Sequence, residues 1–165
     1  MARFLRLALL AATLQGLPHA LSAQGTGTGS GVRVGVTLGA ISTVGLSVEY
    51  VREHHAMDFN VGTWSFRDLS VSAVVKEYFG AGDLLPFVGG GVWLVAARGG
   101  GERTGLAVVL HAPVGVDWQA AEGSYLGMTL NVNRALAVRR ADPTDDLPLN
   151  GRLIPLPGVY YRWKR

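Results

Sequence analysis

The chain has 165 residues, of which 16% are charged, and its formal net charge at pH 7 is +3. Ordinary soluble domains have roughly 25% charged residues, so this chain is poor in charge. It has no basic run with interleaved aromatic residues, which argues against a nucleic-acid partner. It also contains no cysteine, so a disulfide framework is excluded and stability must come from packing or from a membrane.

The first 23 residues have the pattern of a cleavable signal peptide. Arg3 and Arg6 form a positive start, an apolar run covers 5–14, and small residues at 18–23 place the cleavage near Ser22 or Ala23. The apolar run has about ten residues, whereas a membrane-spanning helix needs about 20. We therefore predict an exported chain with a signal peptide at 1–23, a Gly/Ser/Thr-rich linker at 24–30 and one domain at 31–165.

Eight segments of this domain alternate between apolar residues and polar or small residues, as β-strands do. In chain order the expected strands cover 32–38, 44–52, 57–64, 69–79, 86–97, 105–118, 125–138 and 153–163. The clearest is 105–118, where Leu110 and Trp118 belong to an unbroken apolar stripe and His111 and Asp117 share the opposite face. A soluble strand typically has about 5–6 residues and a tilted membrane strand about 9–11, so the length favours a membrane strand.

Alternation alone leaves two barrels open, a soluble calyx with an apolar interior and a membrane barrel with an apolar exterior. The low charge content and the polar faces rich in Gly, Ser, Thr and Asn favour the membrane barrel. We therefore predict an all-β fold, a single eight-stranded antiparallel up-and-down transmembrane β-barrel. The lumen is expected to hold paired charges and a structural histidine, because buried charges need partners. The predicted lumen network comprises Arg33, Glu49, Asp58, Lys76, His111, Asp117 and Arg162.

Aromatic residues gather near one set of strand ends. If both termini are periplasmic, these ends lie at the periplasmic interface, where aromatic rings prefer the level of the lipid headgroups. The predicted periplasmic girdle comprises Tyr50, Phe79, Phe87, Trp118, Tyr125, Tyr161 and Trp163. Trp64 and Phe66, with Trp93 as a further candidate, are expected to form a thinner belt at the opposite rim.

Two stretches resemble a known family. Residues 72–94, SAVVKEYFGAGDLLPFVGGGVWL, and residues 114–132, VGVDWQAAEGSYLGMTLNV, resemble hairpin signatures of the small outer-membrane β-barrel superfamily, the OmpA-, OmpX- and OmpW-like proteins. The resemblance implies an outer-membrane location and insertion by the barrel assembly machinery, which in this family recognises a C-terminal aromatic pattern like Val159, Tyr161 and Trp163. Family members have long outer loops, whereas here only the connection at 141–151, which contains Asp142, Asp145 and Asp146, is long.

Prolines mark two irregular places. Pro155 and Pro157 share a parity, so their missing N–H donors face the same side, and we expect a weakened ladder whose outer half can separate together with the acidic connection. Pro113 is expected to cause a local bulge.

No catalytic, cofactor or metal site is evident in the sequence. The adjacent His54 and His55 point to opposite sides of an extended chain, and the clusters at 89–91 and 99–101 are strand and turn glycines without the residues of a phosphate loop. Our leading hypothesis is a non-enzymatic outer-membrane barrel with a structural or envelope-integrity role and membrane lipids as partners. The alternatives are a narrow conduit for a small apolar ligand, as in OmpW-like proteins, through a lateral opening beside Pro155 and Pro157, and a lipid A-modifying enzyme.

Overall fold

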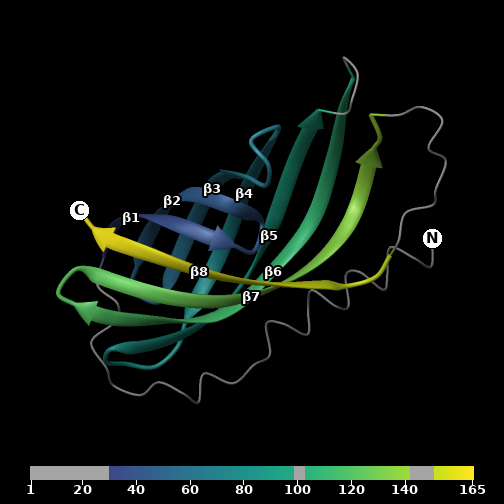
Figure 1. Ribbon diagram of the computed structural model, residues 1–165. Coiled ribbons are helices and arrows are strands. Elements are labelled where there is room, and N and C mark those ends of the chain that lie inside the picture. The colour runs from purple at the N-terminus through teal and green to yellow at the C-terminus, as the bar shows by residue number, and fades with distance from the viewer. Residues whose placement is uncertain (1–29, 99–102, 142–150) are drawn as a thin grey trace, which may run out of the picture.

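The protein forms a closed eight-stranded antiparallel barrel, in which each strand pairs with the next and β1 pairs with β8. The computed structural model describes residues 30–98, 103–141 and 151–165. The strands are β1 (Gly31–Gly39), β2 (Ser42–Arg52), β3 (His55–Thr63), β4 (Asp68–Tyr78), β5 (Leu84–Arg98), β6 (Thr104–Ala121), β7 (Ser124–Arg139) and β8 (Ile154–Lys164) (Figure 1). The predicted fold class is confirmed, and the expected strands differ from these only at their ends. The predicted signal peptide lies outside the described residues, as does most of the predicted linker.

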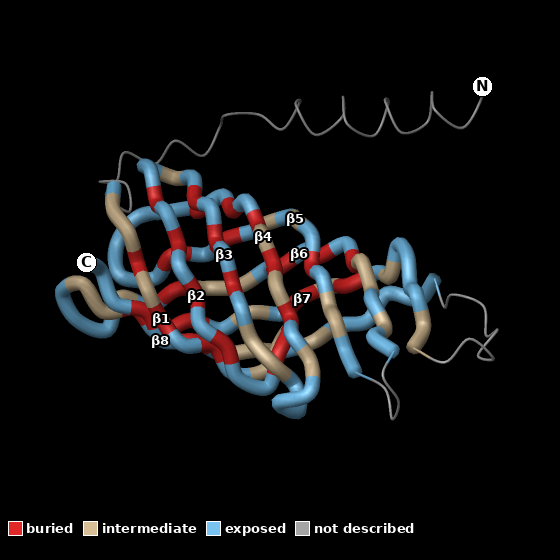
Figure 2. Tube along the Cα trace, turned by 90° about the horizontal axis from the view of Figure 1, so that it is seen from above, coloured by how far each residue is buried: buried red, intermediate tan, exposed pale blue. Residues whose placement is uncertain are grey.

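The barrel has its polar side chains inside and its apolar side chains outside. On β2, Leu46 is 67% exposed, while Glu49 on the other parity is fully buried. The same alternation runs along the other strands, so buried and exposed positions alternate along the tube in Figure 2. Because successive strand residues point to opposite faces, the period of two in the sequence produces the alternation of buried and exposed positions, and the structure turns the polar face inward. Within the described residues, no helix is long and apolar enough to cross a membrane.

The two ends of the barrel differ in shape. We call the end that holds Gly31 and Lys164 the terminal end and the opposite end the distal end. At the terminal end the strands are joined by short turns, such as the one between β2 and β3, where Glu53 has a φ of 57°. At the distal end β5, β6 and β7 extend beyond the shorter β1 to β3 and form a projection (Figure 1).

The ladder between β7 and β8 is continuous through both prolines, which corrects the expected weakening. Pro157 lies opposite Leu130 and Pro155 opposite Val132. In an antiparallel strand the N and O atoms of one residue point to the same side. The Pro157 carbonyl accepts a hydrogen bond of 2.8 Å from the Ala40 N–H, so the missing proline donors face the β1 side, away from β7. The ladder between β1 and β8 extends only to Gly39 and Gly158, so both prolines lie beyond its end and no ladder hydrogen bond requires their N–H, as is usual for proline at a sheet edge.

The expected bulge at Pro113 is also wrong. Pro113 lies opposite Asn131 in an unshifted register, and the shifts between β6 and β7 fall at Val108/Val109 and Gln119/Ala121. On its other side the pairing of β5 with β6 is interrupted between Val88 and Gly91 without a change of register. A proline that lacks its N–H thus opens the ladder here without inserting an extra residue.

Candidate functional site in the barrel interior

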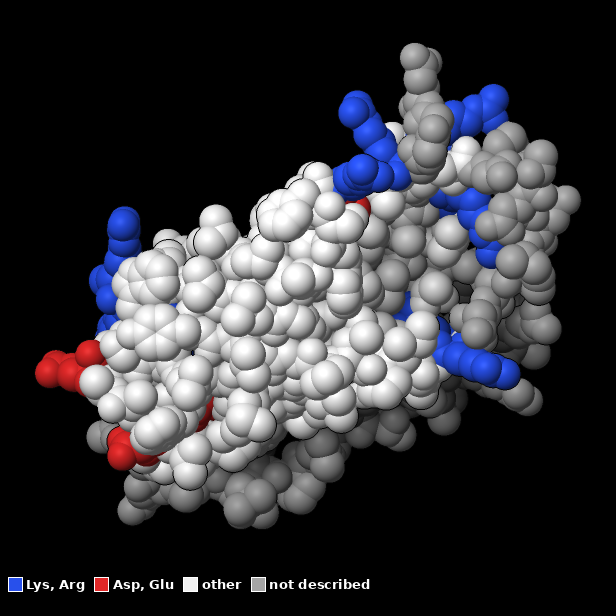
Figure 3. Space-filling model, viewed as in Figure 1, with Lys and Arg blue, Asp and Glu red and all other residues white. Residues whose placement is uncertain are grey.

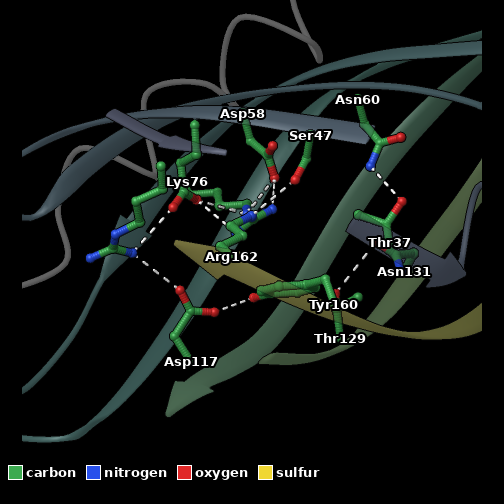
Figure 4. A network of polar contacts seen from close by, with 12 residues as sticks. Thr37, Ser47, Asp58, Asn60, Lys76, Asp117, Thr129, Asn131, Tyr160 and Arg162 are labelled. Atoms are coloured by element: carbon green, nitrogen blue, oxygen red, sulfur yellow. Dashed lines mark hydrogen bonds and ion pairs between the residues drawn. The ribbon is translucent and has the colours of Figure 1, made fainter. Parts of the chain in front are cut away.

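The terminal half of the interior is filled by a cluster of alternating charges, which we call the ionic layer. It consists of three cations and three carboxylates from six strands, Arg33, Glu49, Asp58, Lys76, Asp117 and Arg162. All six are at least nine-tenths buried. Figure 4 shows the side chains reaching across the lumen from opposite walls.

Glu49 is the centre of the ionic layer. Its carboxylate lies 3.1 Å from Arg33 Nη1, 3.0 Å from Lys76 Nζ and 3.0 Å from Arg162 Nη1. It also lies 2.8 Å from the Tyr78 hydroxyl. The side chain is fully buried, so the carboxylate is stabilised entirely by these groups in place of water.

The other two carboxylates complete the charge balance. Asp58 lies 2.6 Å from Lys76 Nζ and 2.5 Å from Arg162 Nη2. Asp117 lies 3.2 Å from Arg33 Nη1 and accepts a hydrogen bond from the Tyr160 hydroxyl. Each cation therefore contacts two carboxylates, and the formal charges of the ionic layer cancel.

Aromatic rings pack against the cations of this layer. The Arg33 guanidinium carbon lies 3.8 Å from the ring centroid of Tyr125, and that of Arg162 lies 4.0 Å from the centroid of Tyr160. Lys76 Nζ lies 4.7 Å from the centroid of Phe87. Such cation–π contacts add attraction where the charges are desolvated.

The inward position of Phe87 and Tyr125 corrects the predicted girdle. Phe87 is only 1% exposed and Tyr125 only 4% exposed, so neither lies on the outer surface. The reason is parity, because their neighbours Val88 and Leu126 point outward and adjacent strand residues face opposite sides. The remaining girdle residues, Tyr50, Phe79, Trp118, Tyr161 and Trp163, are exposed on the outer surface toward the terminal end.

The middle of the interior is filled by neutral polar side chains. His111 does not join the ionic layer, and its Nδ1 lies 2.7 Å from Asn133 Oδ1. The Asn133 amide nitrogen donates to the Ile154 carbonyl at 3.2 Å, and that of Asn131 donates to the Leu156 carbonyl at 3.1 Å. We call His111, Asn131 and Asn133 the amide layer. It ties side chains of β7 to the backbone of the distal part of β8.

An apolar cluster closes the interior at the distal end. Ile41, from the turn between β1 and β2, packs inward against Trp93 and Val109, and Leu156 packs against this cluster. The Trp93 indole N–H donates to Ser70 Oγ at 2.6 Å, and the Ser70 hydroxyl donates to the Ile41 carbonyl at 2.6 Å. We call Ile41, Trp93 and Val109 the distal cap. Trp93 is only 9% exposed, so it points inward and does not belong to the outer belt for which the sequence made it a candidate.

A small polar cavity remains between the ionic layer and the distal cap. Its volume is about 40 Å³, and its lining includes Asp58, Asn60 and His111. Asp58 Oδ1 and Asn60 Oδ1 are buried without a hydrogen-bond partner among the described residues. A water molecule needs about 10–15 Å³ and two or more polar partners, so the cavity has room for a few water molecules.

The charged groups of the interior neutralise one another. The carboxylates contact cations, and His111 Nδ1 contacts the side-chain amide oxygen of Asn133. No group of three His, Asp or Glu side chains among the described residues could hold a metal ion.

Sequence reasoning missed two members of the site. Tyr78 and Tyr160 are 2% and 5% exposed, and their hydroxyls contact the carboxylates of the ionic layer. Parity would have identified both, since Tyr78 shares the face of Lys76 and Tyr160 shares the face of Arg162.

A closed eight-stranded barrel with an apolar exterior and a polar, filled interior defines the small outer-membrane β-barrel fold. A solved structure with the same fold is the N-terminal β-barrel domain of OprF from Pseudomonas aeruginosa, with a TM-score of 0.61 and 12% sequence identity over 82% of this chain and 98% of that chain. The resemblance to this superfamily, read from residues 72–94 and 114–132, is therefore confirmed at the level of the fold. No family model and no curated protein matches the sequence.

Proposed function

We propose that the protein is a non-enzymatic β-barrel of a bacterial outer membrane, with a structural or envelope-integrity role and a lumen closed to solutes. The observation that carries this proposal is the inverted polarity of the barrel, with exposed apolar side chains outside and a neutralised ionic layer inside. In water, such an exterior would leave a large apolar surface exposed, whereas in a bilayer it meets hydrocarbon.

The strand lengths support membrane insertion. The shortest strands, β1 and β3, have 9 residues each, and a tilted membrane strand needs about 9–11. The outward aromatic residues Tyr50, Trp118 and Trp163 lie toward one end of the apolar surface, as residues at a membrane interface do. Insertion by the barrel assembly machinery belongs to the same proposal and rests on the outward Val159, Tyr161 and Trp163.

The filled interior supports a structural role over a pore. The ionic layer and the distal cap close the lumen at two levels, and the cavity between them is about 40 Å³. An eight-stranded barrel has just enough interior for side chains. We therefore expect no sustained single-channel conductance when the purified protein is reconstituted in planar bilayers, and stable open steps would contradict a closed lumen.

Membrane insertion is tested by comparing one substitution at two depths. Leu46→Arg places a charge in the middle of β2 on the outer surface, and we expect a loss of roughly 2–4 kcal/mol in unfolding free energy measured in bilayers with urea. Leu153→Arg is the matched control, since Leu153 is 64% exposed against 67% for Leu46 but precedes β8 at the distal end. It should cost at most about 1 kcal/mol, as at a membrane interface. Equal losses, or a wild-type protein that stays monomeric in buffer without detergent, would overturn the proposed location.

A conduit for a small apolar ligand remains a second candidate because of one feature of the wall. A groove of about 560 Å³ crosses the outer surface of β6, β7 and β8, and Leu38, Gly158 and Val159 line both this groove and the interior cavity. The wall is thin at Gly158, which has no side chain. Crosslinking β1 to β8 with cysteines at Leu38 and Val159, which lie opposite each other, should abolish uptake of an apolar compound into protein-containing vesicles if this path is used.

A further inference from the structure

Among the described residues, the charges at the distal end are mainly positive, whereas those at the terminal end have both signs. At the distal end, the described cationic residues are Arg67, Arg98, Arg103, Arg134, Arg139, Arg140 and Arg152. The described acidic residue at this end is Asp68, whose carboxylate accepts hydrogen bonds from the Trp64 and Ser65 backbone N–H groups. The terminal end mixes both signs, with Arg52, Glu53, Glu77, Asp83, Glu122, Lys164 and Arg165. In Figure 3 Lys and Arg gather around the distal projection, and acidic atoms are prominent at the opposite end.

Three of the distal arginines share the outer face of the projection formed by β5, β6 and β7. Arg139 lies opposite Leu106 and Arg134 opposite Leu110, and directly opposed residues of an antiparallel pair point to the same face. Leu106 is 46% exposed and Leu110 is 48% exposed, so both arginines point outward. Arg98 is exposed and lies opposite Thr104, two positions from Leu106, which places it on the same face.

A β-bulge brings Arg134 and Arg139 onto one face. Residues five apart on a regular strand would point to opposite sides. The register shift between Val108 and Val109 pairs Val108 with Ala137 but Val109 with Ala135, so the extra residue on β7 restores the outward direction of Arg139. Four residues of β6 separate Leu106 from Leu110, so the two arginines lie on the order of 13 Å apart.

We propose that this face binds a phosphate-bearing lipid of the outer leaflet, with Arg98, Arg134 and Arg139 contacting the phosphates and Leu106 and Leu110 contacting the acyl region. The face that carries these arginines continues into the apolar outer surface toward the terminal end. A lipid whose headgroup binds the arginines can therefore place its acyl chains on that surface. Arginine pairs with phosphate through two parallel hydrogen bonds, and the separation of Arg134 and Arg139 suits a headgroup with two phosphates. The inference rests on the proposed membrane function and adds that the distal end lies at the outer leaflet, toward the outside of the cell.

The test compares lipids and variants in a non-ionic detergent, with native mass spectrometry of the folded full-length mature chain. The probes are bisphosphorylated lipid A, its monophosphorylated form and phosphatidylcholine. We expect the bisphosphorylated form to bind most tightly and phosphatidylcholine least. Each arginine near an anionic surface contributes a factor of roughly five, so the triple variant R98Q/R134Q/R139Q should lose on the order of a hundredfold in affinity. The matched control R52Q/K164Q/R165Q, which removes three cations from the terminal end, should bind as the wild type does.

Several results would overturn this inference. They are equal binding of the three lipids, retention of affinity by the distal triple variant, an equal loss in the terminal control, or equally tight binding of an acidic polysaccharide without acyl chains. The two proposals fail separately. A chain whose unboiled and boiled samples migrate alike in detergent gels has no closed barrel and argues against the membrane function itself. A heat-modifiable chain that does not select phosphate overturns only the lipid site.

Discussion

The terminal and distal halves of the barrel interior are filled by different chemistry, although the same strands line both. The ionic layer links six strands through charges, whereas the amide layer and the distal cap use neutral groups, two of which bond backbone carbonyls of β8. In the terminal half β8 pairs with both β1 and β7, and the charged side chains of the ionic layer bond one another. In the distal half the side-chain amides of Asn131 and Asn133 donate to the Leu156 and Ile154 carbonyls of the neighbouring strand β8.

Because of this difference, a substitution in the ionic layer should lower the unfolding free energy more than a substitution in the distal half. A buried charge that loses its partner remains in a low-dielectric site, whereas a neutral amide that loses a partner leaves a smaller penalty. The difference can be tested by removing a charge, by crowding the ionic layer, and by deleting one neutral hydrogen bond.

The largest effect is expected for Glu49→Gln. The substitution keeps the shape of the side chain but leaves Arg33, Lys76 and Arg162 with two carboxylates between them. Breaking a buried ion pair on one side typically costs about 3–5 kcal/mol, which should appear in urea unfolding of the bilayer-inserted protein. Glu122→Gln, in the exposed turn between β6 and β7, is the control and should change the unfolding free energy by less than about 0.5 kcal/mol. A small loss at Glu49 would mean that water or rearranged neighbours compensate the charge.

A smaller loss is expected for Gly127→Ala. A Cβ at Gly127 would lie 2.1 Å from the ring of Tyr160, so the ring that packs on Arg162 must move. Overpacking of this kind costs about 1–3 kcal/mol. Gly90→Ala is the matched control, since nothing lies within 4 Å of a Cβ there, and an alanine in a strand should be neutral or slightly stabilising. Equal effects of the two variants on unfolding would show that Tyr160 is not tightly held.

The smallest effect is expected for Trp93→Phe in the distal cap. The change removes the indole N–H that donates to Ser70 Oγ, while the Ser70 hydroxyl keeps its bond to Ile41. One neutral hydrogen bond contributes about 0.5–1.5 kcal/mol, so the loss should be well below that of Glu49→Gln. If thermal or urea unfolding ranks the two variants in the opposite order, the contrast between the two halves is wrong.

The period of the sequence carried most of the fold. Alternation predicted the strands and identified Arg33, Glu49, Asp58, Lys76, Asp117 and Arg162 as inward residues, and the structure buries all six. Phe87 and Tyr125 were predicted on the wrong face. They were assigned from the preference of aromatic rings for strand ends and not from the alternation along their strands. The weakening expected from Pro155 and Pro157 was wrong for another reason. A missing N–H weakens a ladder only if a neighbouring strand pairs on that side.

Which side chains share a face can be read from the sequence, because that property depends only on the alternation along one strand. Which side chains meet depends on the tertiary structure. Arg162 and Asp58 are 104 positions apart and come together only when β8 closes on β1. The bulge that turns Arg139 outward, and the early end of β1 beside Pro157, likewise depend on register between strands. Closure of the barrel is set by contacts between distant segments, and the alternation along one strand fixes the face of each residue but not its exact partner on the neighbouring strand.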